Sequence, residues 1–234
     1  VFPMEASMPY LIEEAIVKSY ETKGWDIHTS QNYFYSNPWQ SNGECFPIMS
    51  EMLIELEEVI ESKKFGQELQ EKYRGSLISR LDNLTIGSKG RMLNTRRSIN
   101  IIDLMNQKVV IELEELKDEQ DKALIMGLLI GRIAEAAKYL HKQNNNFRHL
   151  TLIEEAHRLL EKADGNNERA KKLGINLFAN LLAEVRKYGE GLIIADQIPN
   201  KLAVEVLKNT NTKIIHRLFA SDDRRAMGET IGLQ

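Results

Sequence analysis

Residues 149–157 read HLTLIEEAH, and this stretch decides the fold. A short apolar run is typical of a buried parallel strand, and α/β sheets carry their chemistry at the carboxyl ends of such strands. Glu154 and Glu155 lie at that end, and residues 156–160 predict the start of the next helix. Two adjacent acids there suit a nucleoside triphosphatase, in which one helps to hold Mg²⁺ and its neighbour orients the attacking water. A strand that ends in a solvated acidic turn has the same pattern.

A second apolar run, residues 191–195, is followed by Asp196 and Gln197. Because parallel strands end at the same edge of a sheet, we expect Gln197 to lie near Glu155. A glutamine there can sense a γ-phosphate or help to position water. It can equally cap the helix that follows Pro199, or bond to loop backbone.

The carboxyl-terminal part, residues 107–234, alternates strand and helix patterns. Strands are predicted at 109–113, 149–154, 191–197 and 213–218, and helices at about 119–142, about 169–187 and after Pro199. This order predicts the α/β class, with a parallel sheet and right-handed crossovers. Residues 1–106 predict an all-helical subdomain, with helices at 8–23, from a Ser50 cap onward, and at 66–84. Between them, residues 25–47 predict a long loop with weak structure.

Composition limits the classes of function. The 234 residues carry 31 Lys plus Arg against 34 Asp plus Glu, a net charge of −3, so any nucleic-acid contact needs a local basic patch. The single cysteine, Cys45, cannot form an internal disulfide, which favours the cytoplasm. The longest apolar run, 123–131, is less than half of the roughly 20 residues that span a membrane. No export signal is visible, and the start without methionine indicates a piece of a longer polypeptide.

Two groups of cations are candidates for binding. Arg186 ends a predicted helix, where a cation complements the helix dipole; it could also be an arginine finger that reaches a neighbouring subunit's nucleotide. The only dense basic cluster is Lys89, Arg91, Arg96 and Arg97. It could contact DNA phosphates or an adjoining subunit, and a solvated loop would look the same.

Three ordered segments together resemble the FtsK–HerA group of ring ATPases, and most closely its HerA-like branch of DNA-translocating ATPases. They are 153–157 (Ile-Glu-Glu-Ala-His), 184–191 (Glu-x-Arg-Lys-Tyr-Gly-x-Gly) and 193–199 (Ile-Ile-Ala-Asp-Gln-x-Pro). The tail at 209–218 and the Asp-Asp-Arg at 222–224 continue the match. The resemblance covers about residues 108–233 well, and the helical front half more loosely.

The resemblance implies an ATP-driven hexameric motor that works on DNA, with ATP and Mg²⁺ bound to a RecA-like P-loop core. Residues 1–106 would be a helical subdomain inserted in that ATPase domain, and 107–234 its carboxyl-terminal half. By position, Glu154 would be the Walker B acid that reaches Mg²⁺, Glu155 the catalytic base and Gln197 the sensor. Arg186 would be the trans-acting finger, with Arg217 as a reserve nucleotide-binding candidate. A nuclease or other effector partner, in DNA end processing or antiphage defence, is also implied.

One departure from the family is large. The phosphate-binding loop, Gly-x-x-x-x-Gly-Lys-Ser/Thr, is absent, since residues 87–90 (Gly-Ser-Lys-Gly) have neither the spacing nor the flanking strand and helix. We expect that loop upstream of this sequence, and we expect the chain alone to be inactive towards ATP. The alternative function is a non-catalytic HerA-like scaffold that assembles a nuclease or other effector. A smaller departure is Glu154, where many relatives carry Asp.

Two further likenesses are weaker. Residues 154–157 (Glu-Glu-Ala-His) resemble the DEAH-box helicases, but those enzymes have Ser-Ala-Thr after the next strand, where this chain has Ala-Asp-Gln. We expect His157 to pack or hydrogen-bond locally. Glu115 and Lys117 imitate the Glu-x-Lys of restriction-type nucleases, but no further acid is obvious on a neighbouring strand, which favours a solvated strand end.

Overall fold

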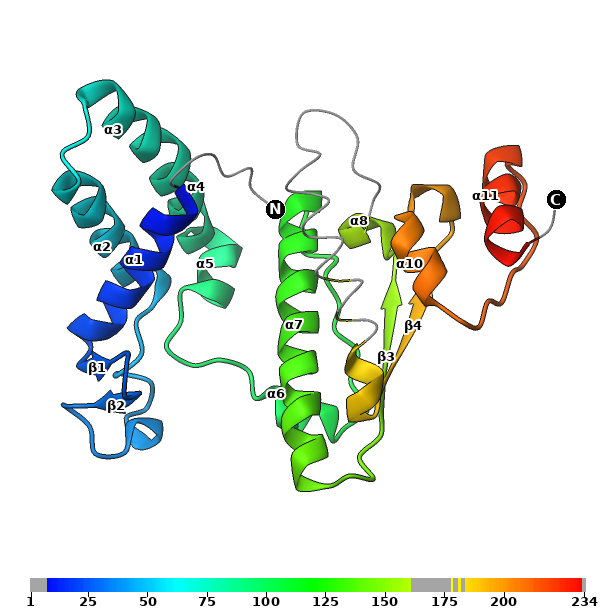
Figure 1. The fold of residues 1–234 in the computed structure, drawn as a ribbon, viewed down its shortest axis with the longest axis horizontal. Coiled ribbons are helices and arrows are strands. Elements are labelled where there is room, and N and C mark those ends of the chain that lie inside the picture. Colours follow the sequence, from blue (N-terminus) through cyan, green and yellow to red (C-terminus); the bar gives the residue numbers. More distant parts are fainter. Residues whose placement is uncertain (1–7, 161–177, 179–180, 182–183, 233–234) are drawn as a thin grey trace. The chain divides into compact units, whose positions relative to one another are not determined.

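The computed structural model describes residues 8–160, 178, 181 and 184–232 (Figure 1). The chain divides into two compact units between Ile99 and Asn100. We call residues 8–99 the helical unit and residues 100–232 the sheet unit.

In the helical unit, two amphipathic helices form the core. Helix α1 (Met8–Thr22) and helix α2 (Met49–Ser62) bury apolar side chains spaced three or four residues apart, such as Leu11, Ala15 and Leu56. Residues 67–85 continue as α3 (Gln67–Tyr73), a π-helical turn η2 (Arg74–Ile78), α4 (Ser79–Asp82) and a 3₁₀ turn η3 (Asn83–Thr85). The predicted helix at 66–84 is thus present as one uninterrupted helical run, with a π-helical turn inside it and a 3₁₀ turn at its end. Helix α5 (Gly87–Leu93), which follows, was not predicted.

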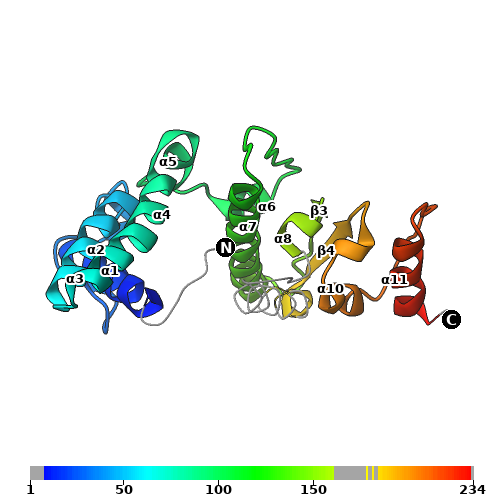
Figure 2. The ribbon, with the colours of Figure 1, turned by 90° about the horizontal axis from the view of Figure 1, so that it is seen from above.

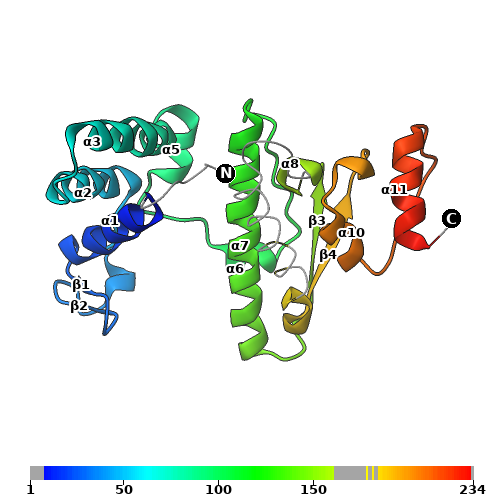
Figure 3. The same ribbon diagram turned by 45° about the horizontal axis from the view of Figure 1, so that its top comes forward.

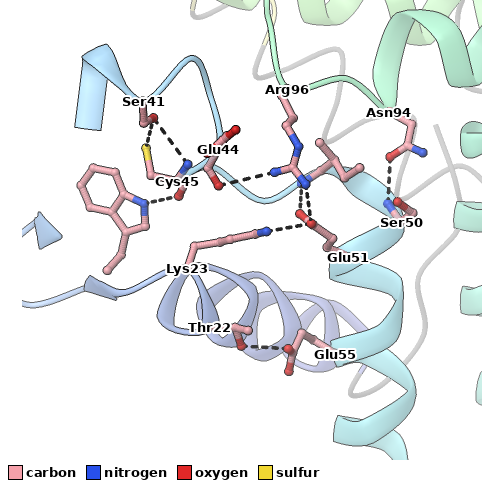
Figure 4. Close-up of polar contacts among 12 residues, drawn as sticks. Thr22, Lys23, Ser41, Glu44, Cys45, Ser50, Glu51, Glu55, Asn94 and Arg96 are labelled. Carbon is pink, nitrogen blue, oxygen red and sulfur yellow. Dashed lines mark hydrogen bonds and ion pairs between the residues drawn. The ribbon is translucent and has the colours of Figure 1, made fainter. Parts of the chain in front are cut away.

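The segment between α1 and α2 is more ordered than its composition predicted. Strand β1 (Trp25–Asp26) pairs antiparallel with β2 (Gln31–Asn32), and a 3₁₀ turn, η1, covers Pro38–Gln40. The indole N–H of Trp25 donates to the Cys45 carbonyl at 2.6 Å. Lys23 and Arg96 both reach the Glu51 carboxylate, at 2.7 and 2.8 Å (Figure 4). Local polar contacts order this segment together with a small aromatic cluster, in which the Phe46 ring lies 5.4 Å from both the Trp25 and the Trp39 ring.

The predicted Ser50 cap was wrong. The N-cap position is two residues earlier, at Ile48, so α2 begins at Met49, and the Glu51 carboxylate accepts the Ile48 backbone N–H at 3.0 Å. The Ser50 backbone N–H instead donates to the Asn94 side-chain oxygen at 3.0 Å (Figure 4).

The sheet unit contains the predicted parallel pair of strands. Strands β3 (His149–Glu154) and β4 (Glu190–Ala195) run in parallel, with His149 opposite Glu190 and Glu154 opposite Ala195. The α/β class with a parallel sheet is therefore confirmed. Of the predicted helix at 169–187, most lies outside the described residues. Its end forms the 3₁₀ turn η4 (Arg186–Tyr188).

Helices cover one face of this pair. Helix α7 (Glu119–Gln143) was predicted, and the Asp118 carboxylate caps its first turn by accepting two backbone N–H groups. Helix α8 (His157–Leu160) lies between α7 and the two strands (Figure 2, Figure 3). The remaining elements are α6 (Ile101–Met105), η5 (Pro199–Lys201), α10 (Val204–Asn209) and α11 (Ser221–Ile231). The core unites α7, β3, α8, α10 and α11 through residues such as Ile130, Ile153, Leu160, Val206 and Met227.

Two predicted strands were wrong. Residues 109–113 and 213–218 have no regular structure, and most of their side chains are exposed, such as Val110 at 84% and Ile214 at 86%. β-propensity expresses packing against neighbouring strands, and an isolated extended segment is not stable in water. No strand pairs with either segment among the described residues. The opposite face of β3 and β4, with Leu150, Leu152 and Ile193, is likewise exposed, so these strands are buried on one face only.

Gly189 lies in the turn directly before β4, and its substitution tests the fold. Its φ is +78°, and a Cβ would stand 2.0 Å from the Phe147 carbonyl oxygen. We expect Gly189→Ala to lower the free energy of unfolding by about 1–3 kcal/mol from the left-handed backbone alone, with the clash adding to this. Gly131→Ala is the control, because nothing lies within 4 Å of its Cβ position in α7. It should raise that free energy by about 0.5–1 kcal/mol.

Denaturant titration of the chain, followed by circular dichroism, measures both changes. An unaltered unfolding midpoint in Gly189→Ala would contradict the close approach of this turn to Phe147.

Candidate functional site

The carboxyl ends of β3 and β4 form the candidate site. Because Glu154 lies opposite Ala195, Glu155 and Asp196 leave the sheet at the same edge. Figure 1 shows the β3 arrowhead close to α8 at this edge. Glu154 and Gln197 are both exposed there. Gln197 does not cap the following turn, since η5 has Ile198 as its N-cap and no side-chain cap bond. The edge therefore presents two carboxylates and one amide to solvent.

Glu155 has a strained backbone. Its φ of +52° lies in the left-handed region, which a non-glycine residue rarely adopts. Such strain concentrates at functional sites, where the surrounding structure holds it in place. The side chain is 38% exposed. Its Oε2 atom lies 3.8 Å from His157 Nε2 and 3.7 Å from the Arg158 guanidinium.

Asp196, which follows β4, forms hydrogen bonds to His157, which follows β3. Its carboxylate accepts the backbone N–H of His157 at 2.7 Å and that of Ile198 at 2.8 Å. The His157 ring nitrogen Nδ1 lies 3.0 Å from the same carboxylate, whose side chain is only 3% exposed. Asp196 thus fixes the start of α8 and, through an Asx turn, the loop that carries Gln197.

Sequence reasoning missed Asp196 and gave His157 only a local contact. The one signal in the sequence was an Asp placed two residues before an N–H donor in a turn, which is common and unspecific. Arg158 was also missed; it bridges Glu155 and Glu119, which lies in the first turn of α7.

Arg186 lies at the other end of β4. It is exposed in η4, just before the strand begins, whereas Gln197 follows the strand's end. Six residues of strand span roughly 20 Å, which is beyond the reach of one side chain. Arg186 and the candidate edge of its own chain are therefore separated. Arg217, in the irregular segment 213–218, lies over the Phe219 ring at 4.8 Å.

The basic cluster of the helical unit is partly engaged in the fold. Lys89 and Arg91 lie on α5, while Arg96 pairs with Glu51 and donates to the Glu44 carbonyl. Partial burial raises the pKa of Glu51, but bonds from Lys23, the Ile48 N–H and Arg96 outweigh it, so the pKa is lowered on balance.

Arg97 bonds to the Asn42 side chain. Arg96 and Arg97 thus hold the segment between α1 and α2, as Figure 4 shows for Arg96.

The described residues contain no cluster of three or more His, Cys, Asp or Glu side chains that could hold a metal ion. Mg²⁺ is commonly held by one or two carboxylates together with substrate phosphates and water, so an exposed Glu154 at a strand end fits that ion. Within the same described part of the chain, no helix is both long enough and apolar enough to cross a membrane.

Comparison with known proteins shows that the chain is similar in sequence to HerA helicases. No protein-family model matches it. It is 30% identical over 123 residues to the DNA double-strand break repair helicase HerA of Sulfolobus acidocaldarius, covering 52% of this chain and 24% of that protein. It is 29% identical over 136 residues to a probable helicase of Methanocaldococcus jannaschii, covering 56% of this chain and 25% of that protein.

With the HerA of Sulfurisphaera tokodaii it shares 28% identity over 201 residues, 75% of this chain and 39% of that protein. These matches confirm the resemblance to the HerA-like ATPases. The chain spans about a quarter to two fifths of the length of these relatives.

Proposed function

We propose that this chain is the carboxyl-terminal half of the ATPase domain of a HerA-type DNA translocase. Its RecA-like core is completed by a phosphate-binding loop outside these 234 residues. The observation that supports this proposal is the shared edge of β3 and β4: Glu154 ends β3 opposite Ala195 at the end of β4, and Glu155 and Gln197 follow within two residues of these ends. Chemistry at the carboxyl ends of adjacent parallel strands is the rule in open α/β sheets. The length of the HerA relatives leaves room for the missing loop.

In this proposal each polar group at the edge has one task. Glu154 holds Mg²⁺, directly or through water, and the ion neutralises charge on the phosphates. Glu155 accepts a proton from the attacking water and orients it towards the γ-phosphate. Gln197, exposed on the loop that Asp196 fixes, contacts the γ-phosphate or that water.

We further propose a hexamer in which Arg186 completes the site of a neighbouring subunit. The separation of Arg186 from the edge of its own sheet supports action in trans. We assign the helical subdomain inserted in the ATPase domain to residues 1–106, of which 8–99 form the helical unit and 100–106 belong to the sheet unit. Of its basic cluster, Lys89 and Arg91 on α5 would contact DNA phosphates or an adjoining subunit, while Arg96 and Arg97 are engaged within the helical unit. The single cysteine favours the cytoplasm.

Comparing the chain with the complete protein tests this proposal. The complete protein should hydrolyse ATP in a Mg²⁺-dependent and DNA-stimulated reaction, whereas the 234-residue chain should show no turnover above the no-protein control. The chain lacks the backbone amides and lysine that hold the β- and γ-phosphates. Steady-state phosphate release measures both. Comparable turnover by the chain alone would contradict the assignment.

The absence of that loop from the sequence also supports a second candidate, a HerA-like scaffold that assembles a nuclease or other effector without hydrolysing ATP. The same assay separates the two. A complete protein that binds its effector but shows no ATP turnover would favour the scaffold.

A further inference from the structure

We propose that Asp196 and His157 form a positioning pair for Glu155, an inference that rests on the proposed function. The pair acts through the candidate base without touching the nucleotide. It keeps the Glu155 carboxylate in one orientation, from which it can meet the attacking water.

The first support is the orientation of the His157 ring. An ionised carboxylate only accepts hydrogen bonds, so the contact of 3.0 Å between Asp196 and His157 Nδ1 assigns a proton to Nδ1. Asp196 also accepts the backbone N–H of His157, which fixes the ring from two sides. The His157 side chain is only 14% exposed. The ring is therefore held so that Nε2 faces Glu155.

The second support is the approach of two side chains to the Glu155 carboxylate. His157 Nε2 and the Arg158 guanidinium approach the same carboxylate oxygen, Oε2, at 3.8 and 3.7 Å. Both distances exceed direct hydrogen bonds. With the ring proton on Nδ1, Nε2 only accepts, so a water that donates to both Nε2 and the carboxylate would bridge that contact, whereas the Arg158 guanidinium can donate to the carboxylate after a small shift.

The backbone of Glu155 makes such positioning necessary. A left-handed residue after a strand turns the side chain sharply away from the strand direction, and Glu has three rotatable side-chain bonds. Without contacts at Oε2, the carboxylate would sample several rotamers and meet the attacking water in only a fraction of them. A misplacement of about 1 Å costs on the order of a hundredfold in rate.

Two substitutions separate positioning from simple anchoring of α8. In His157→Asn, the carboxamide N–H₂ occupies roughly the place of Nδ1, so the bond to Asp196 survives while nothing faces Glu155. In His157→Gln, the amide reaches towards Glu155 but the bond to Asp196 is lost. Both are made in the complete protein, with Glu155→Gln as the reference and the midpoint of thermal unfolding as the control for folding.

We expect His157→Asn to keep the unfolding midpoint and the KM for ATP within about twofold, while kcat falls by about a hundredfold. His157→Gln should retain more of kcat than His157→Asn, despite a lower unfolding midpoint.

The outcomes are distinct. Wild-type kcat in His157→Asn overturns the positioning role, as does a loss of kcat matched by a fall in the unfolding midpoint, since both indicate an anchor only. If Glu155→Gln itself turns over ATP at the wild-type rate, the proposed function fails. A Glu155→Gln loss with normal His157 variants leaves the proposed function standing and rejects this inference.

Discussion

Replacing Arg186 with alanine in the complete protein is expected to lower ATP turnover by roughly 10³–10⁵-fold, while the affinity for ATP stays nearly unchanged. A finger arginine stabilises charge that develops on the transferred phosphoryl group, so its loss affects the transition state far more than the bound nucleotide. Steady-state phosphate release and equilibrium binding of a fluorescent ATP analogue measure the two effects. Lys187→Ala is the matched control, since it removes a second exposed cation from the same turn, η4.

Mixing experiments decide whether Arg186 acts on a neighbouring subunit. Subunits with Arg186→Ala keep an intact strand edge, and subunits with Glu155→Gln keep an intact arginine. In mixed rings, a site formed by the edge of the first and the arginine of the second is complete, so part of the turnover should return. The distance from η4 to the far end of β4 makes this arrangement the expected one. Rings that stay inactive at every mixing ratio would favour a role within one subunit.

The parts of the fold that sequence predicted well are those fixed by local periodicity. The apolar spacing of α1 and α7 and the two runs ending at Glu154 and Ala195 all form the expected elements. The elements that were predicted wrongly are strands, which form only where another strand pairs with them. Residues 109–113 and 213–218 have β-rich composition, yet a strand requires a neighbour to satisfy its backbone groups, and none is present among the described residues.

The candidate site also has some features that local sequence predicts and others that depend on tertiary contacts. The positions of Glu154, Glu155 and Gln197 follow from where the strands end, which the sequence shows. The bond between Asp196 and His157 joins residues 39 positions apart, so no local pattern indicates it. Likewise, the left-handed backbone of Glu155 could not be foreseen, because tertiary contacts impose it against the residue's own preference.

Glu155→Gln should leave the complete protein able to bind ATP yet lower turnover by about 10²–10⁴-fold, the usual contribution of a positioned general base. Glutamine has the same shape as glutamate, so the strained backbone and the packing of α8 are preserved. Only the ability to accept a proton is removed. Phosphate release in a single turnover measures the chemical step, and binding of an ATP analogue confirms that the site is occupied.

Glu119→Gln is the matched control for Glu155→Gln. Glu119 contacts Arg158, the same arginine that approaches Glu155, but it comes from α7 and not from a strand end. If the rate depended only on the charge balance around Arg158, both substitutions would have similar effects. We expect Glu119→Gln to stay within about threefold of the wild-type rate, because a half-exposed ion pair contributes little. Undiminished hydrolysis in Glu155→Gln would instead remove the base from this edge, because no other carboxylate leaves β3 directly beside Glu154.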